Sequence, residues 1–200
     1  MLFDELKTKL LPSLSKAESF GFFVSGGFDS AVLLYACCLI REQENLPSQF
    51  EVFTVPRHDN SIVHSARIVE WVNKQFNINL TTTTVGNPDL HHSKQVYSGA
   101  EDAWNIVDHL VFGDTANVPH IPDGPVRYPY QGNDDRVLQP FMKDYKDKVI
   151  QLALEMNLTE LADITHSCTM SKTLRCNKCW QCQERAWAFS VNNYIDTGTM

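Results

Sequence analysis

Residues 19–40 read SFGFFVSGGFDSAVLLYACCLI, and the fold prediction starts from this stretch. Its first part, residues 19–24, is a short apolar run of the kind that buried parallel strands show. The hexapeptide SGGFDS follows at 25–30, and residues 31–40 have the apolar composition of a buried helix. Because an open parallel sheet binds its ligand just after a strand ends, this glycine-containing turn is a candidate binding loop.

Strand and helix patterns alternate along the rest of the chain, which predicts an α/β fold with a parallel sheet. Strands are predicted at 51–55, 78–85 and 110–112, and helices at 64–76, around 95–108, and from about residue 144 to a C-cap at Asn157. The stretch 113–139 holds many prolines and glycines and is typical of a lid, a binding loop or a disordered segment. We expect one domain over residues 1–200.

Composition excludes several classes of protein. The 17 Lys and Arg against 24 Asp and Glu give a net charge of −7, which argues against nucleic acid as a partner held by bulk positive charge. No apolar run approaches the roughly 20 residues that span a bilayer, so no membrane association is expected. The N-terminus has Phe3, Leu6 and Leu10 at helical spacing rather than a signal sequence, and the cysteines do not form a disulfide pattern. These features predict a cytoplasmic protein.

The hexapeptide SGGFDS has the residue types that a phosphate needs. Gly26 and Gly27 permit positive φ angles and close backbone approach, so that successive N–H groups can surround an anion. The N-terminus of the following helix adds partial positive charge, and the hydroxyls of Ser25 and Ser30 add donors. The chain lacks the Walker and dinucleotide-binding glycine motifs in this loop. The alternative is a glycine turn capped by Asp29 that binds nothing.

Four of the six cysteines lie close together near the C-terminus, in the segment 165–185. Cys168, Cys176, Cys179 and Cys182 have the spacing C-x7-C-x2-C-x2-C, which suits a closed tetrahedral Zn²⁺ site. An iron–sulfur cluster also takes four cysteines and is the alternative. We interpret Cys37 and Cys38, within the first apolar helix, as small core residues.

The SGGFDS loop resembles the SGGxDS signature of the PP-loop ATP pyrophosphatase superfamily. The resemblance implies ATP and Mg²⁺ as cofactors, with the pyrophosphate portion of ATP held by Ser25, Gly26, Gly27, Phe28, Asp29 and Ser30. Enzymes of this superfamily cleave ATP to AMP and pyrophosphate while adenylating an oxygen of their substrate. The expected fold is therefore the Rossmann-like PP-loop fold with a C-terminal zinc-binding segment.

Residues 140–142 (PFM), Lys146, residues 165–168 (THSC) and the three later cysteines resemble the 7-cyano-7-deazaguanine synthase family of queuosine biosynthesis. The resemblance implies an ATP-dependent C–N ligase that turns 7-carboxy-7-deazaguanine and ammonia into the nitrile, releasing AMP and pyrophosphate or ADP and phosphate. It also implies one structural zinc ion and a homodimer. The match covers about residues 19–70 and 138–190. Between them the chain departs from the family pattern, at residues 86–98 (GNPDLHHSKQVYS) and 121–128 (IPDGPVRY).

Roles for single residues follow from these two resemblances and from position. Lys146 falls in the first turn of a predicted helix, where the helix dipole disfavours a cation, so we expect it to meet a phosphate; a solvated surface lysine is the alternative. Arg57, with His58, resembles the end of the family's Gln-Arg-His motif, although Pro56 replaces the glutamine. We predict catalytic roles for Lys146, Asp29 and Arg57.

Two further sets of residues are less defined by the sequence. Gly113 and Asp114 follow a predicted strand and are candidates for the adenosine pocket, Asp114 also for a contact with Mg²⁺ or substrate. His91 and His92 fit an exposed polar loop better than a metal site. Other functions remain open: a PP-loop enzyme that modifies tRNA, another nucleobase or a protein, and a zinc-stabilised module that binds ATP without turnover.

Overall fold

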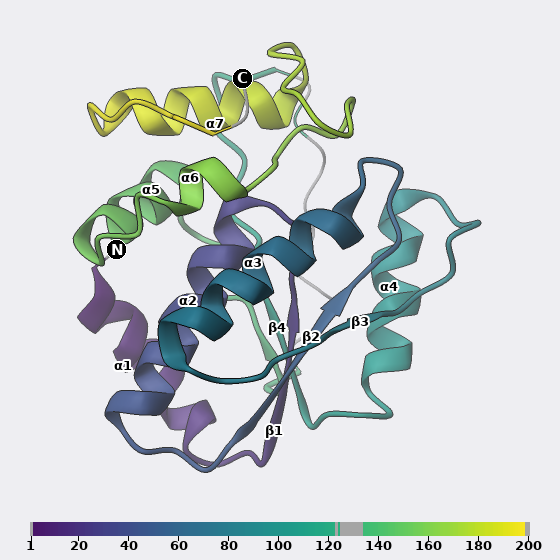
Figure 1. Cartoon of the computed structure of the whole chain (residues 1–200), viewed down its shortest axis with the longest axis vertical. Helices are drawn as coiled ribbons and strands as arrows, with labels where there is room; N and C mark the ends of the chain where they lie inside the picture. The colour runs from purple at the N-terminus through teal and green to yellow at the C-terminus, as the bar shows by residue number, and fades with distance from the viewer. Residues whose placement is uncertain (1, 123, 125–133, 199–200) are drawn as a thin grey trace.

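A five-stranded parallel sheet with the strand order β3-β2-β1-β4-β5 forms the centre of the computed structural model, which describes residues 2–122, 124 and 134–198 (Figure 1). The strands are β1 (Ser19–Phe23), β2 (Gln49–Thr54), β3 (Thr82–Thr84), β4 (His109–Phe112) and β5 (Val137–Leu138). From β1 the chain moves outward to β2 and β3, then returns to the other side of β1 with β4 and β5. The predicted α/β fold is thus confirmed, and its topological switch point lies between β1 and β4.

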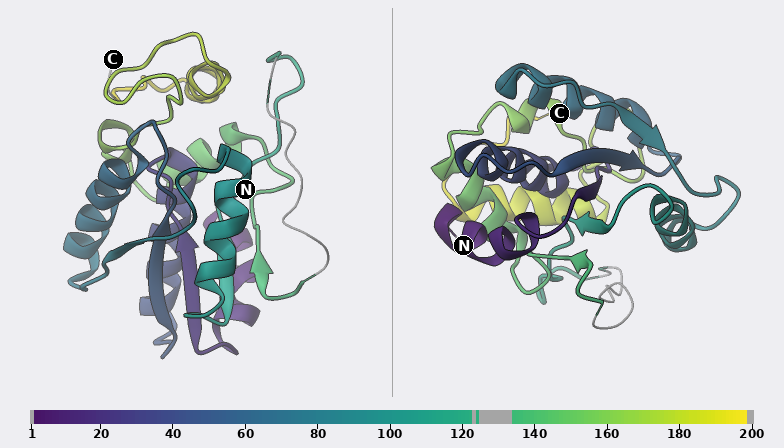
Figure 2. Two further views of the ribbon diagram at one scale, coloured as in Figure 1. Left: turned by 90° about the vertical axis from the view of Figure 1, so that its right-hand side faces the viewer. Right: turned by 90° about the horizontal axis from the view of Figure 1, so that it is seen from below.

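Helices cover both faces of this sheet. They are α1 (Phe3–Leu14), α2 (Phe28–Gln43), α3 (Ser61–Phe76), α4 (His92–Ala103), α5 (Lys146–Glu155), α6 (Leu161–Ile164) and α7 (Trp180–Val191). Figure 2 shows α3 and α4 on opposite sides of the strands, and α7 beyond one end of the sheet. Among the described residues, no helix combines the length and the apolar composition needed to cross a bilayer.

Alternation along β1 divides the interior into two cores. Phe20 and Phe22 point into the larger core, which they share with residues of α1, α2, α5 and α7. Phe23, on the opposite face, packs beside the smaller core that contains Phe53 and residues of α4. Cys37 and Cys38 lie buried in the larger core, as expected.

Several boundaries differ from the sequence prediction; the helix expected around 95–108, for example, is α4 at 92–103. The strand predicted at 78–85 pairs with β2 over 82–84, and the N–H of Val85 also donates to the Thr54 carbonyl. Before residue 82 the Asn73 side chain bonds both the N–H and the C=O of Leu80 instead. The irregular stretch 113–139 contains β5, which pairs with β4 and is too short to show a periodic pattern; its residues 123 and 125–133 lie outside the described residues. The helix from Lys146 has its C-cap at Met156, and Asn157 follows with φ at 58°.

Candidate functional site

The loop between β1 and α2 has a backbone conformation that requires glycine. Gly26 has a φ of 87°, and a Cβ atom placed there would lie 2.4 Å from the Cβ of His64 on α3. Gly27 is the N-cap of α2 and supplies no side-chain cap. The N–H groups of the first helical turn therefore have no acceptor from the helix itself, which is the arrangement that binds anions at helix N-termini.

Two other segments hold this glycine loop in place. The backbone N–H of His166 donates a 2.8 Å hydrogen bond to the carbonyl of Gly26. Gly113, directly after β4, approaches so closely that a Cβ atom there would lie 2.9 Å from the backbone nitrogen of Ser30. Asp114, the next residue, is exposed. The ends of β1 and β4 thus meet at the first turn of α2, where the sequence analysis places the nucleotide.

A buried group of three charges lies beside the loop. Lys146, the first residue of α5, is 4% exposed and forms ion pairs with Asp29 and, at 3.4 Å, with Glu184 of α7. The second carboxylate oxygen of Asp29 is buried and has no hydrogen-bond partner within the described part of the chain. The ion pair with Asp29 joins two residues that are 117 positions apart in the sequence. Glu184 was not among the predicted residues, because a glutamate within a helix usually lies in solvent.

Arg185, the neighbour of Glu184 on α7, packs against Phe28 at the start of α2. Its guanidinium is fully buried, lies 5.6 Å from the ring centre of Phe28, and donates hydrogen bonds to the carbonyls of Ala162 and Thr165. Asp196 forms an ion pair with it at 2.9 Å. Burial lowers the pKa of Arg185. Burial by itself would raise the pKa of Asp196, but the hydrogen bonds and charges of the arginines outweigh it and lower that pKa.

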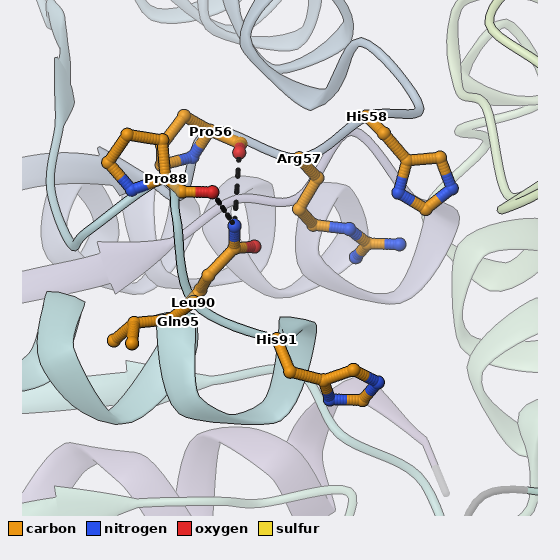
Figure 3. Close-up of a pocket in the computed structure, with 7 residues that line it drawn as sticks. All are labelled: Pro56, Arg57, His58, Pro88, Leu90, His91 and Gln95. Atoms are coloured by element: carbon orange, nitrogen blue, oxygen red, sulfur yellow. Dashed lines mark hydrogen bonds between the residues drawn. The ribbon is translucent and has the colours of Figure 1, made fainter.

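Arg57 lies apart from the ion pair of Lys146 and Asp29, at the mouth of a cavity of about 490 Å³ (Figure 3). Its guanidinium forms an ion pair with Asp59, and its backbone N–H donates to the Ser61 hydroxyl. Gln95 of α4 donates its side-chain N–H groups to the carbonyls of Pro56 and Pro88. The residues that line the cavity are Pro56, Arg57, His58, Pro88, Leu90, His91 and Gln95.

Four of the seven residues that line this cavity lie within 86–98, where the sequence departs from the family pattern: Pro88, Leu90, His91 and Gln95. His91 is exposed at its edge, as expected, and the side chain of His92 lies outside what the structure describes. Gln95 is buried next to Pro56, the residue that replaces the glutamine of the family motif. No sequence pattern indicates this contact, since the two residues are 39 positions apart.

The four predicted cysteines come together between Thr165 and the first turn of α7, which carries Cys182. The sulfur atoms of Cys168, Cys176, Cys179 and Cys182 all lie within 4.8 Å of one another. The Cys176 sulfur accepts hydrogen bonds from the backbone N–H groups of Lys178 and Cys179. These two donors, that of Lys178 first, lower the pKa of Cys176 to about 6, so this residue favours the thiolate that binds metal. The group can hold a metal ion.

Three histidines connect the cysteine segment to the rest of the site. Ring nitrogens of His58, His64 and His166 bond the carbonyl oxygens of residues 169, 172 and 171, respectively. The rings of His64 and His166 stack with centroids 4.4 Å apart, directly beside Gly26. Burial is the main cause that lowers the pKa of His64 and keeps its ring neutral. His64 was not predicted, because a single histidine on a helix carries no specific sequence signal.

The C-terminal part of the chain matches a known protein family. The model of the family described as "Queuosine biosynthesis protein QueC" matches residues 123–193, a range that contains Lys146 and all four clustered cysteines. A search of curated proteins found no match.

Several solved structures have the same fold. NMN synthetase from Francisella tularensis is 15% identical with a TM-score of 0.57, and the alignment covers 98% of this chain and 88% of that one. The U34-tRNA thiolase NcsA from Methanococcus maripaludis, solved with its 4Fe-4S cluster, is 14% identical with a TM-score of 0.52 and coverages of 95% and 73%. The NH3-dependent NAD synthetase from Campylobacter jejuni is 13% identical with a TM-score of 0.50 and coverages of 80% and 76%.

At these identities the three structures bear on the fold alone, whereas the family match bears on the sequence of the C-terminal part. The matched range is in direct contact with the glycine loop, because Lys146 of α5 pairs with Asp29 and His166 donates a hydrogen bond to Gly26. Residues 123–193 thus resemble the QueC family in sequence, and the chain as a whole shares the fold of these three solved structures.

Proposed function

We propose that this chain is an ATP-dependent ligase that adenylates 7-carboxy-7-deazaguanine and reacts it with ammonia to form 7-cyano-7-deazaguanine. The observation that carries the proposal is the contact between Lys146 and Asp29, which brings a cation from the QueC-matched range to the end of the glycine loop, in the first turn of α2. In this proposal the loop residues 25–30 bind the pyrophosphate portion of ATP through backbone N–H groups and hydroxyls.

The adenylation step requires positive charge beside the phosphates of ATP. A carboxylate oxygen of the substrate attacks the α-phosphorus of ATP, the bond from that phosphorus to pyrophosphate breaks, and an acyl-adenylate results. Lys146 and the amides of α2 stabilise the charge that develops on the phosphates. Ammonia then attacks the acyl carbon, AMP leaves, and the nitrogen loses a proton to give the amide. The amide oxygen then attacks the α-phosphorus of a second ATP and pyrophosphate leaves. Loss of AMP together with the two amide N–H protons gives the nitrile.

The residues present fit a magnesium ion as well. Asp29 has a buried carboxylate oxygen without a hydrogen-bond partner in the described residues, and Mg²⁺ prefers such oxygen ligands. In the proposal Asp29 holds Mg²⁺, with the exposed Asp114 as a further candidate ligand, and the ion neutralises charge on the pyrophosphate. Gly113 borders the adenosine, and Arg57 binds the second substrate from its cavity.

We propose Zn²⁺ for the four cysteines. Tetrahedral zinc with sulfur at 2.3 Å separates its sulfurs by about 3.8 Å. The observed sulfurs lie within 4.8 Å of one another, and those of Cys176 and Cys182 are 4.0 Å apart. An iron–sulfur cluster places several irons between its thiolates and so needs the sulfurs farther apart than a single ion does. The ion's role is structural: it ties the segment after His166 to the start of α7.

A tRNA-thiolating activity is the second candidate, favoured by the shared fold with NcsA. Such an activity needs a reactive thiolate near the glycine loop. Cys37 and Cys38 lie on α2, but burial raises the pKa of both, that of Cys38 to about 12, so neither favours the thiolate at neutral pH. The net charge of −7 also disfavours tRNA as a substrate.

The test is an assay with ATP, Mg²⁺, ammonium and 7-carboxy-7-deazaguanine, in which mass spectrometry follows AMP and the nitrile together. We expect both products from the wild type, and neither from Asp29→Ala, with metal content unchanged. Glu42→Ala is the matched control, because Glu42 is an exposed acid on the same helix. Formation of AMP without the nitrile would support the adenylation step and contradict 7-carboxy-7-deazaguanine as the substrate. Full activity of Asp29→Ala, or no AMP from the wild type, would refute the proposal.

A further inference from the structure

We propose that Glu184 is a positioning residue, whose carboxylate holds the Lys146 ammonium at the glycine loop while the substrate is adenylated. The proposal rests on the proposed function of this site. Glu184 is 1% exposed, and its carboxylate oxygen lies 3.4 Å from the Lys146 nitrogen. It comes from α7, whereas Asp29, the other partner of Lys146, comes from α2. Lys146 is thus held from two separate helices.

The second carboxylate differs from the first in where it comes from. Asp29, which pairs with the Lys146 ammonium, belongs to the glycine loop, whereas the buried Glu184 reaches the same ammonium from α7. Phosphate groups that arrive at the loop, together with their Mg²⁺, compete with the ion pair of Lys146 and Asp29. Glu184 does not belong to the loop, so its contact with Lys146 persists when the contact with Asp29 is exchanged for ligand.

The helix that carries Glu184 is a rigid support for this contact. Figure 1 shows α7 lying across the top of the molecule, above α5 and α6, and α5 packs against it. Near its end, the Asn192 side chain donates hydrogen bonds to the carbonyl of Asp147 on α5, at 3.0 Å, and to that of Ala188. Next to Glu184, the hydrogen bonds and ion pair of Arg185 fix the helix to Thr165 and Asp196. The spacing between Glu184 and Lys146 is therefore set by the packing of α7 on α5.

The first experiment compares wild type with Glu184→Gln, which keeps the shape of the side chain and removes its charge. With enzyme in excess over ATP and with the carboxylate substrate present, we expect AMP formation to slow by about tenfold or more, since small misplacements of a charged group cost this much. The ATP dissociation constant should change by less than about threefold, because the loop amides still bind the phosphates. Ser190→Ala, an exposed change on the same helix, should match the wild type.

A double-mutant cycle then tests whether Glu184 acts through Lys146. In the Lys146→Met background, Glu184→Gln should change the rate of AMP formation by less than about twofold. The same loss in both backgrounds, an unchanged rate in the single variant, or loss of bound metal from it would overturn the proposal and leave the proposed function standing. A wild type that forms no AMP would overturn the proposed function, and the role of Glu184 with it.

Discussion

Replacement of Gly26 by alanine tests whether the glycine loop has the conformation described here. The residue has a φ of 87°, and its added Cβ would lie 2.4 Å from the His64 Cβ and 3.4 Å from the His64 backbone. Neither atom is the far end of a flexible side chain, so α3 or the loop itself must move. The carbonyl of Gly26 also accepts the hydrogen bond from His166, which any movement of the loop would stretch.

The expected cost has two parts and one offset. A left-handed φ costs an alanine roughly 1–2 kcal/mol. Forcing an extra carbon into a packed place costs roughly 1–3 kcal/mol, and 2.4 Å is far below the about 3.5–4.0 Å of a normal carbon contact. The alanine recovers about 0.4–1 kcal/mol by restricting the unfolded chain. The net loss of unfolding free energy is therefore about 1–5 kcal/mol, or roughly 2–20 °C in Tm for a protein of this size.

Urea unfolding and thermal unfolding without ligand measure this loss, and Gly27→Ala is the matched control. At Gly27 the nearest atom to an added Cβ is the Ser25 hydroxyl at 3.4 Å, and the residue has a φ of −80°. We expect the control to stay within about 1 kcal/mol of the wild type, which is the usual effect of alanine at an N-cap. Equal stabilities of the two variants would refute the conformation assigned to Gly26.

Other predictions concern the metal, the pH and the buried arginine. Cys179→Ser should lower metal content and Tm together, since metal binding is coupled to folding; elemental analysis showing a full complement of metal would contradict it. Burial lowers the pKa of His64 and His109, so both stay neutral in the folded state while the unfolded chain takes up protons near pH 6.5. Stability should be complete above about pH 6.5 and fall below it, by at most about 1.4 kcal/mol per pH unit for each histidine, and His109→Asn should flatten the curve. Arg185→Met should cost about 3–5 kcal/mol, because Asp196 is left with one arginine; a loss below about 1 kcal/mol would count against the network.

The glycine loop and the cysteine set could be predicted from the sequence because each lies within one short segment. Local spacing fixes where Gly26 and Gly27 fall between a strand and a helix, and four cysteines within fifteen positions can reach one ion in few ways. The parallel sheet followed from alternation of apolar strands and helices, which is also a local pattern. Weakly patterned elements were predicted less well: β5, two residues long, was not predicted, and the strand expected at 78–85 is shorter because Asn73 bonds the backbone of Leu80.

The arrangement around Lys146 was decided only by tertiary structure. Lys146, Asp29 and Glu184 come from three helices; the sequence singled out the first two separately, but it carried no signal for Glu184 or for the contacts among the three. Their contact depends on how α5 and α7 pack beyond the carboxyl ends of the strands, and packing joins residues without regard to their separation in the chain. Local patterns along the chain are enough to predict a glycine loop of the kind that binds phosphate and a segment with four cysteines. Only the folded chain places His166 against Gly26 and Glu184 against Lys146, because burial and ion pairing act across space rather than along the sequence.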